Sequence, residues 1–596
     1  MRSPALLLVL SGLAVPAFAA IYTKPLQLPR ITYDYVIVGA GNAGLVVANR
    51  LTENPKIQVL VLEAGISDEN VLPVIVPFLG PTATPNTPFD WNYTVTPQTN
   101  LDNRAFPYPR GKILGGCSTV NYMTHHYGSS DDYDKLARDT GDAGWSWNNM
   151  QKYIQAHEKF VPPADGHNTT GQFIPEKHGF KGVTSISLPG NSQGIDARVL
   201  STLDELKSEF PFNPDMGGGD ILGIGWAQSS IGNGTRSSSS TSYLRDANSR
   251  PNLHVLIHAT VTKLIPNGFK NGRVSFGGVM FTSTNTAIRL PSFVYATKEI
   301  ILSAGSIGTP QILLLSGIGP KKELSAMGIP TIIDNASVGK NMSEHVLVPN
   351  IFQVTGSESL DELLRGGSFL DNSLAQWTTN KTGPLSNSVT NQLGFLRLPQ
   401  NSSIFQTVPD PSTGPKSSHF EFVIANFWLN PGISVPATGR FFTIVTALIS
   451  PTSRGFVKLA STDPFKAPII NPQLLSTAFD RFAIREAVKA TKRFVSASAW
   501  KDYIIAPFGS NNATTDDEID AHVRSLASTV FHPIGTATMT KAGASWGVVD
   551  PNLKLKGAEG IRIVDASVWP TIPNAHTQGP TYLIAERASD LIKADQ

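Results

Sequence analysis

The sequence predicts an α/β protein, α+β overall, in which a Rossmann-like dinucleotide-binding domain is interrupted by a second domain. Three observations predict it. A glycine-rich turn near residue 40 separates an apolar run from a helical pattern, a second apolar run ends at Glu63, and a short strand with a helical pattern closes the chain. Parts of one dinucleotide site therefore stand at opposite ends of the sequence, which predicts a discontinuous domain.

The glycine-rich turn has the spacing and the context of a phosphate-binding loop. Residues 33–38 form an apolar run with one Asp, typical of a buried parallel strand. Gly39 allows the tight turn, Gly41 lets the backbone approach a pyrophosphate, and Gly44 lets the next helix pack closely on the strand. The N-terminus of that helix would hold the phosphates. The predicted contacts in this turn are Gly39, Gly41, Asn42, Ala43 and Gly44.

Glu63 is the predicted ribose ligand. It follows the apolar strand at residues 56–62 and lies 24 residues after Gly39, close to the spacing of about 20 expected for an acid that binds ribose hydroxyls. A carboxylate there also repels a 2′-phosphate, which disfavours NADP. The fingerprint alone does not separate FAD from NAD.

Two histidines near the C-terminus are candidates for proton transfer. His532 and His576 lie 44 residues apart, so only the fold can bring them together, and imidazole is the side chain best suited to moving a proton near neutral pH. Together with the fingerprint they predict a redox enzyme that oxidises an alcohol on a flavin. Between the two histidines, residues 560–567 predict a short strand ending in Asp565, which could meet ribityl or phosphate groups.

Composition predicts a secreted globular protein. Charged residues make up 16% and the net charge is +2, so nucleic acid is an unexpected partner. Residues 1–20 have the positive start, apolar stretch and A-x-A site of a secretory signal, and no other apolar run is long enough to span a bilayer. We expect a monomer outside membranes that carries N-glycans. Eight N-x-S/T sequons follow the signal, at Asn92, Asn168, Asn233, Asn335, Asn341, Asn380, Asn401 and Asn512.

Four segments together resemble the glucose–methanol–choline (GMC) oxidoreductases, and within that family the fungal aryl-alcohol oxidases. They are the dinucleotide fold, residues 110–121, residues 305–319, and the two histidines with their flanks, so the resemblance runs from about residue 33 to the C-terminus. It implies FAD, with His532 as the base and His576 as the partner that hydrogen-bonds the alcohol oxygen. The other predicted FAD contacts are Gly116, Ser118, Asn121, Val261, Asp565, Ala566, Thr577 and Gln578.

The same resemblance implies that the FAD is non-covalent. Some relatives tether the flavin through a histidine just after the Gly-Gly of residues 110–121, and here Val120 takes that place without a nucleophile. Cys117, the only cysteine, allows no intrachain disulfide. It is expected to be a small residue packed by the isoalloxazine, with a reactive thiol as the alternative.

The scatter of the motifs sets the predicted domain boundaries. Residues 30–160, 232–348 and 531–596 are assigned to the FAD domain, and residues 161–231 and 349–530 to the substrate domain, which family members build on an antiparallel sheet with flanking helices. Strand-like runs at 418–427 and 439–450 and an amphipathic pattern at 480–496 agree with that. Residues 356–391, polar and weakly periodic, predict a loop over the entrance or a plain surface insertion.

Tyr122, Phe531 and Leu429 are the predicted substrate residues. The first two match aromatic positions that line the channel in aryl-alcohol oxidases, and Leu429 replaces a third aromatic, which could widen the entrance; all three could also be ordinary core residues. The expected reaction converts a primary alcohol, conjugated to a ring or double bond, and O₂ into aldehyde and H₂O₂. Alternatives are a dehydrogenase that reduces quinones, a hydroxynitrile lyase with a structural flavin, and a non-catalytic flavoprotein.

No metal is predicted. His125 and His126 are adjacent, and neighbours in sequence point apart in either regular structure. The sequence also shows no Cys/His ligand set.

Overall fold

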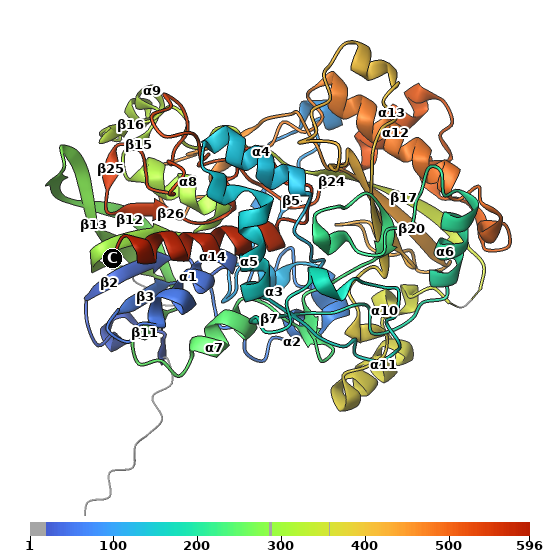
Figure 1. Ribbon diagram of the computed structural model, residues 1–596, viewed down its shortest axis with the longest axis horizontal. Helices are drawn as coiled ribbons and strands as arrows, with labels where there is room; N and C mark the ends of the chain where they lie inside the picture. The colour runs from blue at the N-terminus through green and yellow to red at the C-terminus, as the bar shows by residue number, and fades with distance from the viewer. Residues whose placement is uncertain (1–19, 285–288, 357) are drawn as a thin grey trace, which may run out of the picture.

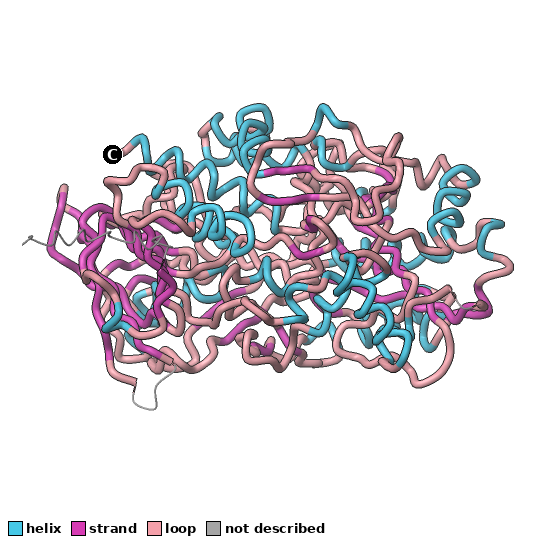
Figure 2. Tube along the Cα trace, turned by 90° about the horizontal axis from the view of Figure 1, so that it is seen from below, coloured by secondary structure: helices cyan, strands magenta, loops and turns pink. Residues whose placement is uncertain are grey.

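Two sheets organise the chain in the computed structural model, which describes residues 20–284, 289–356 and 358–596 (Figure 1). The first sheet lies at the left of that view and the second at the right, and in Figure 2 the strands of the first again gather at the left. The predicted secretory segment lies outside the described residues, apart from Ala20. No helix in the described part of the chain has the length and apolar character needed to cross a membrane.

The first sheet unites both ends of the sequence, as predicted. Its order is β1-β11-β3-β2-β14-β13-β12, with β26 beside β14 and β25 beside β13. The pairs β11/β3, β3/β2, β2/β14 and β14/β26 are parallel, whereas β12, β13 and β14 form an antiparallel extension. The bounds are β1 Ala20–Tyr22, β2 Thr32–Val38, β3 Val59–Leu62, β11 Leu253–Leu256, β12 Ala259–Lys270, β13 Arg273–Ser283, β14 Pro291–Leu302, β25 Ala558–Glu559 and β26 Ile561–Ile563.

Three helices pack around the nucleotide end of this sheet. The helix α1 (Asn42–Thr52) follows the glycine turn, and α14 (Gln578–Ala594) packs against both α1 and α5 (Trp147–His157) (Figure 1). The strands β2 and β3 are apolar because their side chains are buried among these helices and the neighbouring strands. The predicted β–α–β unit and C-terminal helix are confirmed.

The second sheet is antiparallel, also as predicted. Its order is β18-β19-β20-β17-β23, with β24 beside β17. Side chains alternate along each strand: Phe420 and Phe422 pack with the amphipathic helix α12 (Ala478–Phe494), whereas Glu421 and Val423 face a cavity on the opposite side. The bounds are β17 Val346–Val354, β18 Gln392–Leu396, β19 Phe420–Ala425, β20 Phe441–Leu448, β23 Ile504–Pro507 and β24 Ser528–Thr529.

Three details differ from the sequence predictions. The domain boundary placed at 348 cuts β17, which pairs with β20 from Val346 to Gln353, and the first sheet begins at β1, before residue 30. Residues 356–391 are not a simple loop, because they contain α10 (Asp361–Arg365) and α11 (Ser368–Asn380). Only Ser373 and Trp377 of α11 are buried, so the helix has no broad apolar stripe from which the sequence could predict it.

Candidate active site

A cavity of about 310 Å³ lies between the carboxyl ends of β2 and β3 and the inner face of the second sheet. The crevice beyond the carboxyl ends of parallel strands is where such folds bind dinucleotides. Most predicted site residues line it, including the two histidines predicted to be catalytic and the three residues predicted to contact the substrate. The predicted cofactor residues on its surface are Gly39, Gly41, Asn42, Ala43, Glu63, Gly116, Asn121, Val261, Asp565, Ala566, Thr577 and Gln578.

Gly44 and Ser118 do not line the cavity, but each contacts a residue that does. A Cβ on Gly44 would lie 2.0 Å from the carbonyl oxygen of Gly39, so this glycine allows α1 to pack against the turn. The backbone N–H of Ser118 donates to Asn42 Oδ1 over 3.1 Å. Ser118 therefore orients a predicted cofactor residue, and its direct contact with FAD stays a prediction.

The glycine turn leaves room for a ligand backbone. Gly39 has φ +103°, and a Cβ there would lie 2.4 Å from Ser303 O, so only glycine fits. A Cβ on Gly41 would meet only the Cα of Gly116, at 4.0 Å. The protein itself therefore does not require glycine at position 41. Gly41 lines the cavity at the start of α1, and the space beside its backbone fits a pyrophosphate bound at the helix N-terminus.

The two acids at strand ends are already held by protein donors. Glu63 accepts the N–H of Ala40 over 2.8 Å and that of Gly65 over 2.7 Å, and burial raises the pKa of its carboxyl to about 7. Asp565 accepts the N–H of Gly305 over 2.9 Å and the hydroxyl of Thr309 over 2.6 Å. Glu63 thereby fixes the glycine turn and Asp565 caps α8 (Gly305–Leu315); their contacts with ribose or ribityl groups stay predictions.

A buried arginine that the sequence analysis missed supports the other end of the cofactor cavity. Arg236 Nη1 donates to Asn121 Oδ1 over 2.7 Å, and Asn121 Nδ2 donates to Gln578 Oε1 over 2.5 Å. Burial lowers the pKa of Arg236 to about 9. The sequence around Arg236 did not predict a buried functional residue, because it precedes a serine run and such runs usually mark exposed loops.

His532 and His576 meet face to edge. Their ring centroids are 4.9 Å apart and the planes are inclined by 79°. His576 stands at the end of a loop before α14 and its Nε2 lies 2.8 Å from Oε1 of Glu421, a fully buried residue of β19. The pair that the flanking motifs predicted is therefore assembled, and Glu421 is a third member that the sequence analysis missed.

The other ring is held by two residues at the start of β17. His532 Nδ1 lies 3.0 Å from His345 Nδ1, so one ring donates to the other and the tautomers are coupled. The backbone N–H of His532 donates to Glu344 Oε1 over 2.7 Å, and Glu344 also accepts the hydroxyl of Tyr108. These contacts fix both the backbone and the ring of the predicted base.

Burial sets the protonation of this group. Burial, with the neighbouring rings of His576 and His345, lowers the pKa of His532 well below its usual value. Burial also lowers the pKa of His345 to about 3 and raises that of Glu344 to about 7. A lowered pKa means that the neutral imidazole persists as pH falls, so His532 is in the proton-accepting form at neutral pH.

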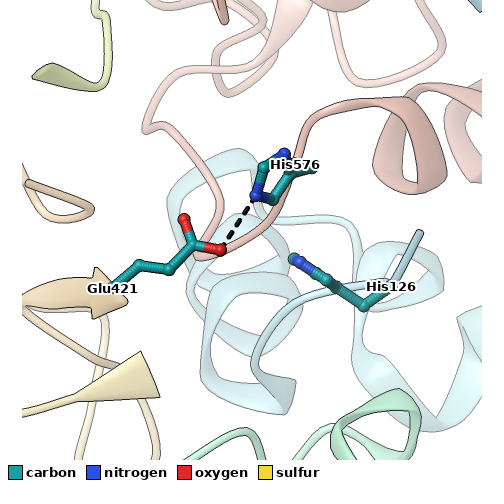
Figure 3. A group of neighbouring side chains, drawn as sticks. All are labelled: His126, Glu421 and His576. Carbon is teal, nitrogen blue, oxygen red and sulfur yellow. Dashed lines mark hydrogen bonds and ion pairs between the residues drawn. The ribbon is translucent and has the colours of Figure 1, made fainter. Parts of the chain in front are cut away.

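His126 joins the histidine pair from a separate loop. Its ring centroid is 5.4 Å from that of His576, and Figure 3 shows His126, Glu421 and His576 directed toward one another. His125 instead stacks on His157 and approaches Gln578, so the two neighbours do point apart. The expected lack of a ligand set is corrected: His126, Glu421 and His576 each offer an atom, all within 4.8 Å of one another. That no metal resides here as a cofactor stays a prediction.

The predicted channel residues belong to an apolar wall. Tyr122, Leu429 and Phe531 all line the cavity, and Arg110 fixes this side by donating to Phe531 O over 2.6 Å and contacting Cys117 Sγ at 2.7 Å. Between them and the second sheet the lining is aliphatic, made of Leu347, Val389, Val423, Val445, Ala447 and Val530. This wall of the cavity is therefore largely apolar, and its polar groups include Glu421 and the Tyr122 hydroxyl.

The missed residues differ in how visible they are in the sequence. Glu421 is a lone acid inside an otherwise apolar strand, which is a recognisable signal, because a buried carboxylate needs a partner. Glu344 and His345 were given no role in the sequence analysis. His126 and Arg236 carry no local signal.

Comparisons with known proteins identify the family to which this chain belongs. Family models described as GMC oxidoreductase match residues 33–347 and 451–585. A Hericium erinaceus protein named Dehydrogenase eriK is 39% identical over 98% of each chain, and pyranose dehydrogenase 3 of Leucoagaricus meleagris is 36% identical over 98% of this chain and 97% of its own. The chain belongs to the GMC oxidoreductase family.

Solved structures agree in fold over nearly the whole chain. An Aspergillus oryzae formate oxidase variant superposes with a TM-score of 0.86 at 30% identity, over 95% of this chain and 98% of that one. A fungal aryl-alcohol oxidase superposes with a TM-score of 0.78 at 25% identity, over 95% and 99%. This protein is therefore a flavin-dependent oxidoreductase that acts on CH–OH groups and uses FAD, and the fit of the glycine turn to a dinucleotide agrees with that.

Proposed function

We propose that this protein oxidises apolar primary alcohols, conjugated to an aromatic ring or double bond, to aldehydes, with O₂ as electron acceptor. The observation that supports it most is the aliphatic and aromatic wall around a pair of histidines. A sugar would have to leave several hydroxyls unpaired against that wall, and an unpaired buried hydroxyl is costly.

The chain supplies proton transfer and orientation. FAD, which the glycine turn and the start of α1 would hold, would supply the acceptor for the hydride of the alcohol carbon and the route for the electron pair to O₂, giving H₂O₂. His532 takes the hydroxyl proton on Nε2, because its Nδ1 is engaged with His345. His576 shares Nε2 with Glu421 and so has Nδ1 left for the alcohol oxygen. Tyr122 and Phe531 stack on a flat substrate, each contact contributing about 0.5–1.5 kcal/mol beyond area burial.

An anaerobic flavin-reduction screen tests the substrate class. A methoxybenzyl alcohol, an allylic alcohol, a short aliphatic alcohol and glucose are mixed with the holoenzyme, and bleaching of the flavin is followed. We expect the conjugated alcohols to reduce it fastest and glucose slowest. Preference for glucose would overturn the substrate assignment, and no bleaching by any alcohol would favour a lyase.

A second candidate is the same oxidation with an acceptor other than O₂. It is favoured by the two relatives named dehydrogenases, at 39% and 36% identity. H₂O₂ formed per aldehyde under air, with and without a benzoquinone, separates the two. A ratio near one that a quinone does not suppress supports the oxidase.

We also propose that the FAD is held without a covalent bond. Val120, which lines the cavity, cannot form one. Acid precipitation should release all yellow colour into the supernatant. Colour retained in the pellet would contradict this and direct attention to Cys117, another lining residue.

Secretion as an N-glycosylated monomer is part of the same proposal. Asn335 and Asn341 are partly buried and donate their amides to the backbone, to Gly547 O and Pro570 O. We therefore expect glycans at the exposed sequons and none at these two, which glycopeptide mass spectrometry of the secreted protein would check. The exposed sequons are Asn92, Asn168, Asn233, Asn380, Asn401 and Asn512.

A further inference from the structure

The side chains of His126, Glu421 and His576 form a buried group whose polar atoms are only partly used. Glu421 is fully buried and His126 is 3% exposed. Within the described part of the chain, neither ring nitrogen of His126 has a hydrogen-bond partner, and Oε2 of Glu421 has none either. Only the contact from His576 Nε2 to Glu421 Oε1 satisfies the group. Buried polar atoms left in this state call for an occupant that pairs with several of them at once.

The chemistry of the three side chains fits a divalent transition metal. Two imidazoles and one carboxylate form a three-ligand set that Zn²⁺ accepts, with a fourth position open to water or substrate. Neither ring nitrogen of His126 has a partner among the described residues, so a nitrogen of this ring is available as a ligand. The ligand atoms lie within 4.8 Å, against about 3.3 Å in an ideal tetrahedral zinc site, so modest rotamer shifts would close the group around an ion.

We propose that His126, Glu421 and His576 form an inhibitory binding site for an exogenous transition-metal dication, represented by Zn²⁺. Figure 3 shows the ring of His126 directed at the gap beside the Glu421–His576 contact. Glu421 and His576 also line the cavity, so an ion bound there has its open position toward the alcohol. Binding uses the Nε2 lone pair of His576 and so ends its present contact with Glu421. The ring then shifts toward the ion, its Nδ1 no longer faces the alcohol oxygen, and the zinc-bound enzyme does not bind the alcohol.

The binding half of the proposal is tested on EDTA-treated wild-type holoenzyme. Crystals soaked in Zn²⁺ should show an anomalous peak at the zinc edge between the three side chains. In solution, Co²⁺ should give ligand-field absorption to the red of the flavin bands at one equivalent per chain. An empty gap in zinc-soaked crystals, with density there explained by water alone, would overturn the proposal whatever the enzyme oxidises.

The inhibition half rests on the proposed alcohol oxidation. Zn²⁺ should raise the apparent KM for the alcohol and leave kcat unchanged. His126→Leu should raise the Zn²⁺ concentration for half-inhibition at least tenfold, because loss of even an outer-shell partner costs about 10–100-fold in metal affinity. It should also abolish the Co²⁺ spectrum.

Two control variants locate the effect. Cys117→Ser removes the only thiol on the cavity, and His167→Gln removes a partly exposed histidine paired with Asp165. Both should retain the wild-type response to Zn²⁺. An effect that survives in His126→Leu, or disappears in Cys117→Ser, would contradict the site. If His126→Leu does not fold, the zinc-edge map of the wild type decides the question. If no alcohol is oxidised but the peak is present, the metal site stands and only the proposed function fails.

Discussion

The two ends of the cavity are built by different means. The end at the glycine turn is made mostly of backbone: Gly39, Gly41 and the start of α1 lie within one short stretch of chain. The end at the histidines is made of side chains, and Glu421, His532 and His576 come from a strand of the second sheet and two separate loops. Substitutions at the glycine turn should therefore prevent FAD binding or folding. Substitutions at the histidines should lower the rate of flavin reduction and leave FAD binding and folding intact.

The largest effect is expected at the glycine turn. Gly44→Ala places a Cβ 2.0 Å from Gly39 O, so the turn and α1 cannot both keep their places, and no yellow, folded protein should be recovered. Gly41→Ala is the matched control, since its Cβ would meet only Gly116, at 4.0 Å. It should fold but hold FAD weakly. Circular dichroism and the ratio of flavin to protein absorbance measure both, and a yellow, stable Gly44→Ala would break the comparison.

At the other end, His532→Ala should leave a normally coloured protein that hardly reacts. Loss of the base should slow anaerobic flavin reduction by at least about 10³-fold, since general base catalysis contributes about 10²–10⁴ and here is coupled to hydride departure. Stopped-flow absorbance at the flavin band measures the rate. Retention of more than a tenth of the wild-type rate would show that another group takes the proton.

Glu421→Gln should give an intermediate effect. The amide keeps the shape of the side chain but removes the charge that faces His576 Nε2, at 2.8 Å in the wild type. We expect flavin reduction to slow by about 10–100-fold, as seen when a second partner that orients a functional group is lost. FAD content and melting temperature should change little. A wild-type rate would show that Glu421 has only a structural role. Loss of FAD would show that Glu421 is needed for cofactor binding, which would contradict the comparison.

The smallest effect is expected at the channel wall. Leu429 is buried at the edge of the second sheet's inner face. Leu429→Phe restores an aromatic ring there and should raise kcat/KM for a methoxybenzyl alcohol relative to a short aliphatic alcohol by up to about tenfold, the equivalent of one added ring contact. An unchanged ratio of the two values would show that the substrate does not touch this position.

The same contrast explains what the sequence could predict. Gly39, Gly41 and Gly44 were assignable because their roles depend on local backbone geometry. The contacts of Gly39 and Gly44 agree with their roles in the turn and in helix packing, and the approach of a pyrophosphate to Gly41 stays a prediction. His532 and His576 were assignable only through the resemblance of their flanks. His345 and His126 owe their places to long-range packing, since no neighbour in sequence hints at the ring each one faces. The helix α11 was missed for a different reason: nearly all of its surface is solvated, so its periodicity carries no apolar signal.

The pairing of β26 with β14 constrains how this protein can be made. β14 pairs with both β2 and β26, which are far apart in the sequence. The cavity is also lined by Asp565, His576 and Thr577, which are synthesised after β26. An emerging chain thus carries a phosphate-binding turn long before it can retain the cofactor. We therefore expect FAD capture to wait until residues 561–577 have been made, and a chain that stops short of Ile561 should remain colourless.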